Sequence, residues 1–325
     1  GSTTSPFCQS LTSAGIAGIR NTASSEEGDI LNVSTSPAYH LLGRAYRRPT
    51  TPPNTDNPTP PRPAWWRPLI ELVIALVLLV TLTSAAIGLF YLYEKIAHPE
   101  VSAFEEYSFL EHPYLAAATF IGWVAMIPAG FIAARVTGRD PRALWSRELR
   151  FRWRNFGLAL LPALLFLGAE GIYAVVISDR SQATFTPMNV AALAVIVALA
   201  PLQSLSEELF FRGSLVQITG QWFSPAVIAY LIPLLFFLSG HHYEWQGMVS
   251  VTVFALCATF LTHTTGGIEA AAAVHAVGNT FAYAPDAFGV DGIDLAVSSS
   301  SDLAISLVAT VAATAGAYAL IRRAQ

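Results

Sequence analysis

From Trp65 to the end of the chain, apolar residues form long uninterrupted runs that are separated by short polar segments. Continuous apolarity, in place of the alternation of a barrel strand, predicts α-helices, because a helix satisfies its backbone polar groups internally. Most runs approach the roughly 20 residues that cross about 30 Å of hydrocarbon. The pattern predicts an all-α, polytopic transmembrane helical bundle of about eight spans, at residues 69–93, 113–134, 156–177, 188–219, 224–240, 246–263, 267–284 and 302–321.

The composition supports this prediction and excludes several classes of protein. Hydrophobic residues make up 53% of the 325 residues and charged residues 12%, about half of the roughly 25% usual in globular proteins. The mean hydropathy is +0.49. So few charges cannot cover a water-soluble surface, which excludes soluble enzymes and nucleic-acid-binding proteins and makes the lipid bilayer the expected partner. Cys8 and Cys257 are too far apart in the sequence to indicate a disulfide framework.

Residues 1–66 differ sharply from the rest of the chain, because they are rich in Ser, Thr and Pro. Such a segment cannot bury enough apolar area to offset the entropy lost on ordering. We therefore expect a disordered cytoplasmic tail at 1–66, acting as a linker or as a docking arm. Residues 67–325 are expected to form the transmembrane domain.

Arginines and carboxylates gather in different loops, and arginine-rich loops stay on the cytoplasmic side of a membrane. With eight spans, every arginine-rich segment falls on one side, so both termini are expected in the cytoplasm of a cell with the chain in its plasma (inner) membrane. The arginines are Arg44, Arg47, Arg48, Arg62 and Arg67, then Arg135, Arg139, Arg142, Arg147, Arg150, Arg152 and Arg154, then Arg322 and Arg323; the acidic loops contain Glu94, Glu100, Glu105, Glu106 and Glu111, and Asp286, Asp291 and Asp294.

Three charged residues, Glu207, Glu208 and Arg212, lie inside the long fourth run. Each costs about 2.5–3.5 kcal/mol at the centre of a span, so each should be paired or face a wet cavity. In an α-helix Glu208 and Arg212 share a face, whereas Glu207 and Arg212 point apart. Arg212 is therefore expected to neutralise Glu208 and leave Glu207 unpaired, ready to accept a proton from water. Ordinary surface charges at a helix end are the alternative interpretation.

Further polar residues interrupt the neighbouring runs. The fifth run ends at His241, and the seventh contains His275 and Asn279 one helical turn apart, so both could donate hydrogen bonds to one oxygen. A single intramembrane histidine can equally serve helix packing. Glu170 in the third run is expected either to line a cavity or to bond to a neighbouring helix. Glu71, near the start of the first run, is expected at the level of the lipid headgroups.

Three motifs follow one another on separate runs: Glu207-Glu208-x-x-x-Arg212, Phe237-x-x-x-His241 and His275-x-x-x-Asn279. Together they resemble the motifs of the CAAX-protease and bacteriocin-processing family of intramembrane proteases, which includes the type II CAAX prenyl endopeptidases. The resemblance covers residues 188–284. It implies that Glu207 and His241 activate a water for attack on a peptide carbonyl, that His275 and Asn279 stabilise the oxyanion, and that Glu208 and Arg212 support them.

The resemblance implies an intramembrane endopeptidase that hydrolyses a peptide bond of a membrane-associated or lipidated protein or peptide, without a cofactor. Zinc bound by Glu207, His241 and His275 is an alternative, because two histidines and one carboxylate can ligate zinc with an open position. A non-catalytic membrane immunity or partner-binding protein of the same family is a second alternative, since the same polar residues could join helices. A transporter is not favoured, because the sequence shows no internal repeat.

Overall fold

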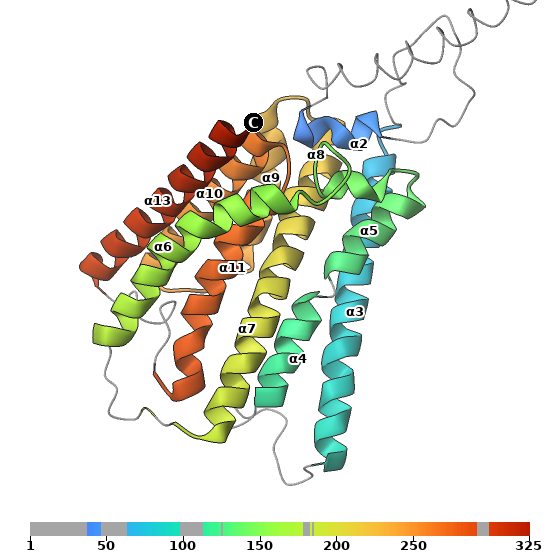
Figure 1. Cartoon of the computed structure of the whole chain (residues 1–325). Helices are drawn as coiled ribbons and strands as arrows, with labels where there is room; N and C mark the ends of the chain where they lie inside the picture. The colour runs from blue at the N-terminus through green and yellow to red at the C-terminus, as the bar shows by residue number, and fades with distance from the viewer. Residues whose placement is uncertain are drawn as a thin grey trace, which may run out of the picture. The chain divides into compact units, whose positions relative to one another are not determined.

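The computed structural model describes residues 38–46, 64–97, 113–124, 126–177, 183, 185–290 and 299–325. Within these ranges the chain is helical, as predicted, and only an isolated bridge joins Ser146 and Gly267 (Figure 1). The long helices are α3 (Arg67–Ala97), α4 (Pro113–Val124), α5 (Met126–Val136), α6 (Trp153–Ile177), α7 (Pro187–Glu207), α9 (Ala226–Ser239), α10 (Trp245–Thr265), α11 (Glu269–Tyr283) and α13 (Ser300–Ala324), and the short ones are η3 (Tyr39–Leu41), α2 (Leu42–Ala45), η4 (Pro141–Leu144), η5 (Glu208–Leu215), α8 (Val216–Trp222) and η6 (Ala284–Phe288).

Every predicted run corresponds to a helix or to consecutive helices, which confirms the all-helical bundle. Among the described residues, five helical stretches are long and apolar enough to cross a membrane: Arg67–Ala97, Trp153–Val176, Pro187–Trp222, Trp245–Thr265 and Ser300–Ala324. Shorter apolar helices occupy the predicted second and fifth spans. Many large apolar side chains on the outer helices are exposed, as lipid-facing surfaces require. The chain is a multi-pass membrane protein.

Local signals in the sequence fix several helix ends. Thr186 caps α7 in a reciprocal capping box with Asn189, and Pro187 follows at the first helical position. At the other end of a helix, α10 stops at Gly266, whose φ of 71° lies in the left-handed region that glycine adopts without strain. Only three residues separate α10 from α11, so these helices are antiparallel neighbours.

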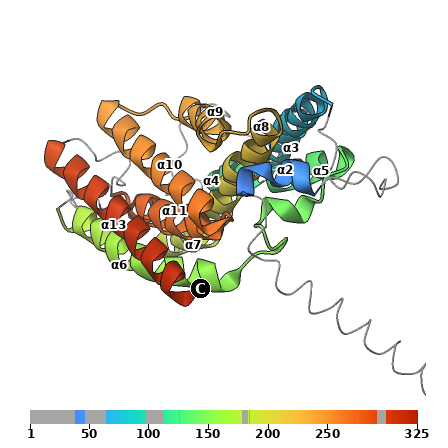
Figure 2. The same cartoon turned by 90° about the horizontal axis from the view of Figure 1, so that it is seen from above.

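Helix α11 lies in the interior of the bundle, between α6 and α7 (Figures 1 and 2). Its residues from Glu269 to Val277 are all buried. Small side chains make this possible, because alanines on α6, α11 and α13 form one buried cluster that lets the backbones approach closely. The first half of helix α11 therefore has no lipid-facing surface. Because its neighbours surround it, α11 can be only 15 residues long, shorter than a helix that crosses the membrane in contact with lipid.

One end of the bundle carries all the described arginines except Arg212, and we call it the basic end. Helices α5, α8, α10 and α13 end there, and α2 lies beside the end of α8 (Figure 1). Arg139 donates to both carboxylate oxygens of Glu71, at 2.8 and 3.0 Å, and both side chains are fully buried. The expected level of Glu71 at the headgroups stays a prediction, and the structure adds that Arg139 and Gln221 satisfy its carboxylate inside the protein.

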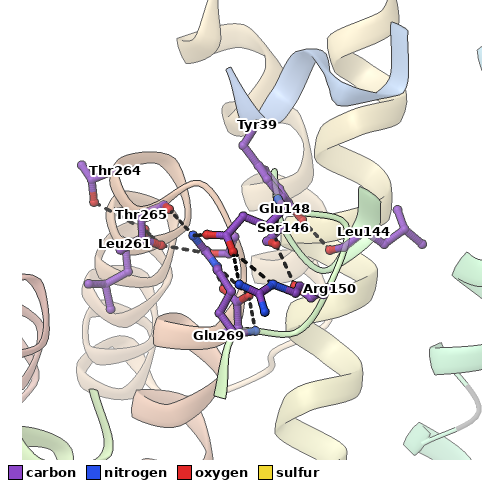
Figure 3. A network of polar contacts seen from close by, with 11 residues as sticks. Tyr39, Leu144, Ser146, Glu148, Arg150, Leu261, Thr264, Thr265 and Glu269 are labelled. Carbon is purple, nitrogen blue, oxygen red and sulfur yellow. Dashed lines mark hydrogen bonds and ion pairs between the residues drawn. The ribbon is translucent and has the colours of Figure 1, made fainter. Parts of the chain in front are cut away.

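A second buried ion pair at the basic end joins the start of α6 to the start of α11. Arg152 donates to Glu269 through Nε at 2.9 Å and through Nη2 at 2.7 Å, and its Nη1 donates to the carbonyl of Thr265. Figure 3 shows Glu269 and Thr265 in this network, with Ser146 and Glu148 of the preceding loop around them. The arginine-rich loop thus also holds helices together.

The predicted disordered tail is wrong for residues 38–46. This segment forms η3 and α2, with Tyr39, His40 and Leu42 buried. The Tyr39 hydroxyl donates to the carbonyl of Leu144 at 2.6 Å, and His40 Nε2 donates to the carbonyl of Ser224 at 2.9 Å. The aromatic side chain of Tyr39 and the aliphatic side chain of Leu42 pack against α8 and η4. They bury apolar area that Ser, Thr and Pro side chains could not supply. The rest of the predicted tail, apart from residues 64–66, lies outside the described residues.

Candidate functional site

A cavity of about 440 Å³ lies within the bundle, and all four predicted catalytic residues line it. Glu207 comes from the end of α7, His241 from the turn after α9, and His275 and Asn279 from α11. The walls come from the halves of α6, α10 and α13 that lie away from the basic end. The remaining lining residues are Phe120, Trp123, Leu167, Glu170, Gln203, Phe211, Phe237, Gly240, Tyr243, Gly247, Ser250, Val251, Phe254, Val274, Gly278, Phe281, Ala282, Tyr283, Ser306 and Thr310.

Glu208 and Arg212 form the expected pair behind the cavity wall. Arg212 Nη1 donates to Glu208 Oε1 at 3.0 Å, and both side chains are buried. The guanidinium carbon also lies 4.1 Å from the centre of the Phe237 ring, a cation–π contact that is stronger in a dry environment. Phe237 of the second motif thus holds the arginine of the first motif, although Glu208 itself does not line the cavity.

The segment that carries Glu208 and Arg212 is not the regular α-helix assumed from the sequence. Residues Glu208–Leu215 form a π-helix, η5, between α7 and α8. A π-helix pairs each residue with the fifth along the chain, and such turns often occur at functional sites. The α-helix ends at Glu207 and the π-helix begins at Glu208. Glu207 lines the cavity, whereas the Glu208 carboxylate lies behind the cavity wall.

Glu207 has a partner that the sequence interpretation missed. Gln203, one helical turn earlier on α7, donates a hydrogen bond from Nε2 to Glu207 Oε1. The second carboxylate oxygen, Oε2, is 3.7 Å from His275 Nε2, which is longer than a hydrogen bond. The expectation of an unpaired Glu207 is therefore wrong in part, because Gln203 holds one oxygen and the other faces His275. The four-residue spacing from Gln203 to Glu207 is the signal that could have found this contact.

His275 and Asn279 are both anchored by residues of the first motif's helix. His275 Nδ1 donates to Glu208 Oε1 at 2.8 Å, so its Nε2 is the nitrogen that faces Glu207. Asn279 Nδ2 donates to Gln203 Oε1 at 2.8 Å. An amide nitrogen carries two hydrogens, and one of them remains for a further acceptor. Two chains of contacts result, from Arg212 through Glu208 to His275 and from Glu207 through Gln203 to Asn279.

His241 is fixed by its own helix end. Its Nδ1 donates to the carbonyl of Phe237 at 2.8 Å, and its ring centre lies 4.5 Å from that of Phe237. A carbonyl oxygen can only accept, so Nδ1 carries the hydrogen and Nε2 of the neutral ring is an acceptor. His241 can therefore take a hydrogen bond from a molecule in the cavity.

The zinc alternative requires Glu207, His241 and His275 to lie close enough together to share one ion. Among the side chains that the structure describes, no group of three or more His, Cys, Asp and Glu is arranged to hold a metal ion. Glu207, His241 and His275 line one cavity. The Nδ1 atoms of the two histidines bond to the carbonyl of Phe237 and to Glu208, so Nε2 is the remaining nitrogen of each ring. The zinc alternative stays a prediction, which metal analysis of the purified protein tests.

Comparison with known proteins supports the resemblance in the region of the site. Residues 188–281 match the family model described as Type II CAAX prenyl endopeptidase Rce1-like, which confirms the family resemblance of this segment. The chain is also 26% identical over 232 residues to "Uncharacterized protein YyaK" of Bacillus subtilis (strain 168), which covers 66% of this chain and 76% of that protein. No solved structure matches the chain significantly.

Proposed function

We propose that this membrane protein is an intramembrane endopeptidase that hydrolyses a peptide bond of a membrane-associated or lipidated protein or peptide. The single observation that carries the proposal is the convergence of Glu207, His241, His275 and Asn279, from three separate parts of the chain, on one cavity. The family match over residues 188–281 supports the same class of reaction. We further propose that the reaction needs no bound metal.

In the proposed mechanism, Glu207 and His241 activate a water molecule. The free oxygen of the Glu207 carboxylate takes a proton from the water while His241 Nε2 orients it, and the water oxygen bonds to the peptide carbonyl carbon. Gln203 holds the other carboxylate oxygen, so the base keeps one orientation. The proton then passes to the peptide nitrogen, the carbon–nitrogen bond breaks, and a carboxylic acid and an amine leave.

His275 and Asn279 are proposed to stabilise the tetrahedral oxyanion. Asn279 offers the second hydrogen of Nδ2, and His275 offers Nε2–H when its ring is doubly protonated. Glu208 accepts a hydrogen bond from the opposite nitrogen of His275 and so fixes the orientation of the ring. Because these donors are already held in place, they need not reorient when the oxyanion forms. The oxyanion is therefore stabilised without a reorganisation cost, and this lowers the barrier of the reaction.

Replacement of Glu207 by Gln tests this mechanism. The amide keeps the size of the side chain but cannot accept the proton from water, so we expect peptide cleavage to fall by at least about 100-fold. The measurement compares membrane proteomes of cells with wild-type and Glu207→Gln protein and looks for a truncated peptide that disappears, followed by cleavage of that peptide by purified protein.

A matched control is Glu148→Gln, which removes an exposed carboxylate of the basic loop and should leave cleavage unchanged. Full cleavage by a folded Glu207→Gln protein would refute the mechanism. A non-catalytic partner-binding role predicts a different result, in which no truncation depends on Glu207 and its replacement only lowers the melting temperature and the abundance of the protein.

A further inference from the structure

The described residues that line the cavity include acidic side chains but no lysine or arginine. Its described lining contains two carboxylates, Glu170 and Glu207, and two imidazoles, His241 and His275, but no Lys or Arg. The remaining polar groups of the lining are amides and hydroxyls. Glu207 and the histidines belong to the proposed mechanism, whereas Glu170 comes from α6 and has no part in it. Glu170 is thus a second carboxylate on the cavity wall, besides the one assigned to the proposed mechanism.

The packing of α6 against α11 fixes the place of Glu170. Phe281 of α11 lies against Gly168 and Gly171, and a Cβ added to Gly171 would be 2.7 Å from the Phe281 ring. The two helices therefore meet closely on both sides of Glu170 in the sequence. Phe281 also lines the cavity, two residues beyond Asn279. The backbone on both sides of Glu170 is thus packed against α11, the helix that carries the proposed oxyanion donors.

The end of the bundle nearer the cavity is acidic in sequence. The segments that connect helices at this end, or that begin and finish those helices, have only two cations, Lys95 and Arg180. A charge excess of one sign attracts ligands of the opposite charge. The carboxylates of these segments are Glu94, Glu100, Glu105, Glu106, Glu111, Asp179, Glu244, Asp286, Asp291, Asp294 and Asp302.

We propose that the cavity selects a peptide with a positively charged side chain close to the scissile bond, and that Glu170 is the carboxylate that pairs with it. This inference rests on the proposed function, because a peptide must occupy the cavity. A lysine or arginine that enters a dry cavity loses its hydration, and a carboxylate on the wall offsets that loss. An acidic side chain or a free terminal carboxylate would meet no Lys or Arg among the described lining residues.

Peptide binding to the Glu207→Gln protein, in which binding is not followed by cleavage, tests the inference. The probes are three sets of fluorescent twelve-residue Ala/Leu peptides that differ only in one Lys, Gln or Glu, scanned along the peptide. A charge-assisted hydrogen bond predicts that the best Lys peptide binds at least about tenfold more tightly than its Glu counterpart. Adding Glu170→Gln should reduce this ratio to about two or less, and Glu170→Asp should retain part of it.

Glu244→Gln is the matched control, because Glu244 is exposed at the same end but does not line the cavity. It should leave the ratio unchanged. Equal binding of the Lys, Gln and Glu peptides would overturn the inference, and so would an equal loss of preference in Glu244→Gln and Glu170→Gln. The ranking of the three peptides needs no variant at position 170, so a Glu170→Gln protein that does not fold leaves the test intact.

Cleavage by the wild-type protein separates this inference from the proposed function. If cleavage depends on Glu207 but proceeds equally fast with Lys, Gln and Glu peptides, the inference about Glu170 fails and the proposed function stands. If the Lys peptides bind with the expected preference but no peptide is cleaved, the proposed function fails, and Glu170 remains the charge-selecting residue of a peptide-binding cavity.

Discussion

At the scale of single residues, the described part of the chain buries three arginine–carboxylate pairs, and they have different tasks. Arg212 and Glu208 lie behind the cavity and orient His275. The other two pairs, Arg139 with Glu71 and Arg152 with Glu269, join helices at the basic end. Neighbours four residues apart in the sequence form the first pair, so the helical repeat predicted it. The other two join distant segments, and only the fold brings them together.

The buried pair of Glu71 and Arg139 should be important for stability. Replacing Glu71 by Ala leaves the Arg139 charge buried without its carboxylate, so we expect the free energy of unfolding to fall by about 3–5 kcal/mol. Unfolding of the purified protein in a mild detergent, titrated with a denaturing detergent, measures the change.

Arg142→Ala is the matched control, because its pair with Asp140 is exposed and should contribute no more than about 1 kcal/mol. Replacing both Glu71 and Arg139 by Met should cost less than Glu71→Ala alone, since no buried charge is then left unpaired. A Glu71→Ala protein as stable as Arg142→Ala would contradict the role assigned to the pair.

At the scale of helices, two elements differ from what the hydrophobic pattern indicates. Residues Glu208–Leu215 form a π-helix within the long fourth run, and the hydrophobic pattern of that run does not distinguish a π-helix from an α-helix. The η3–α2 segment lies in a polar stretch, yet four close-packed residues dock it. Gly220 makes this docking possible, because a Cβ at that position would collide with the carbonyl oxygen of His40.

Gly220→Ala should therefore loosen the η3–α2 segment. Because the colliding atom belongs to the backbone, the segment must shift, and we expect a loss of about 1–3 kcal/mol. Hydrogen exchange measured for residues 38–46 should increase in the variant while exchange in α11 stays slow.

Gly88→Ala provides the comparison within α3, where an added Cβ has no atom within 4 Å. The same change should there be neutral or should stabilise the helix by up to about 1 kcal/mol, because alanine is the better helix former. Unchanged exchange of residues 38–46 in Gly220→Ala would mean that the contact with His40 does not hold the segment.

At the scale of the whole molecule, the cavity lies away from the end of the bundle that carries the arginines. The cavity walls come from the halves of α6, α10 and α13 that lie away from the basic end. The positive-inside rule leads us to propose that the basic end faces the cytoplasm. The cavity would then lie in the outer half of the bilayer.

Labelling of single cysteines tests this orientation. In a protein with Cys8→Ser and Cys257→Ala, a cysteine replaces either Glu148 in the basic loop or Glu244 at the opposite end. Both positions are exposed, and neither substitution removes an arginine that sets the topology. We expect a membrane-impermeant maleimide to label Glu244→Cys in intact cells and to reach Glu148→Cys only after permeabilisation. The reverse pattern would place the basic end outside.

The sequence alone determined the class of the protein, the positions of its spans and the residue types of the candidate site. These features follow from local rules, because span length, helical repeat and the cost of a charge in lipid act on neighbouring residues. The Glu208–Arg212 pair was within reach for the same reason.

Only the tertiary structure decided which distant groups meet. In the structure, Gln203 forms hydrogen bonds with both Glu207 and Asn279. Glu208 contacts His275, and Glu170 lies on the cavity wall. Contacts between α6, α7 and α11 depend on how small side chains let the helices approach, which no single run of the sequence specifies. The hydrophobic pattern turns a polar residue inward, and helix packing then selects its partner.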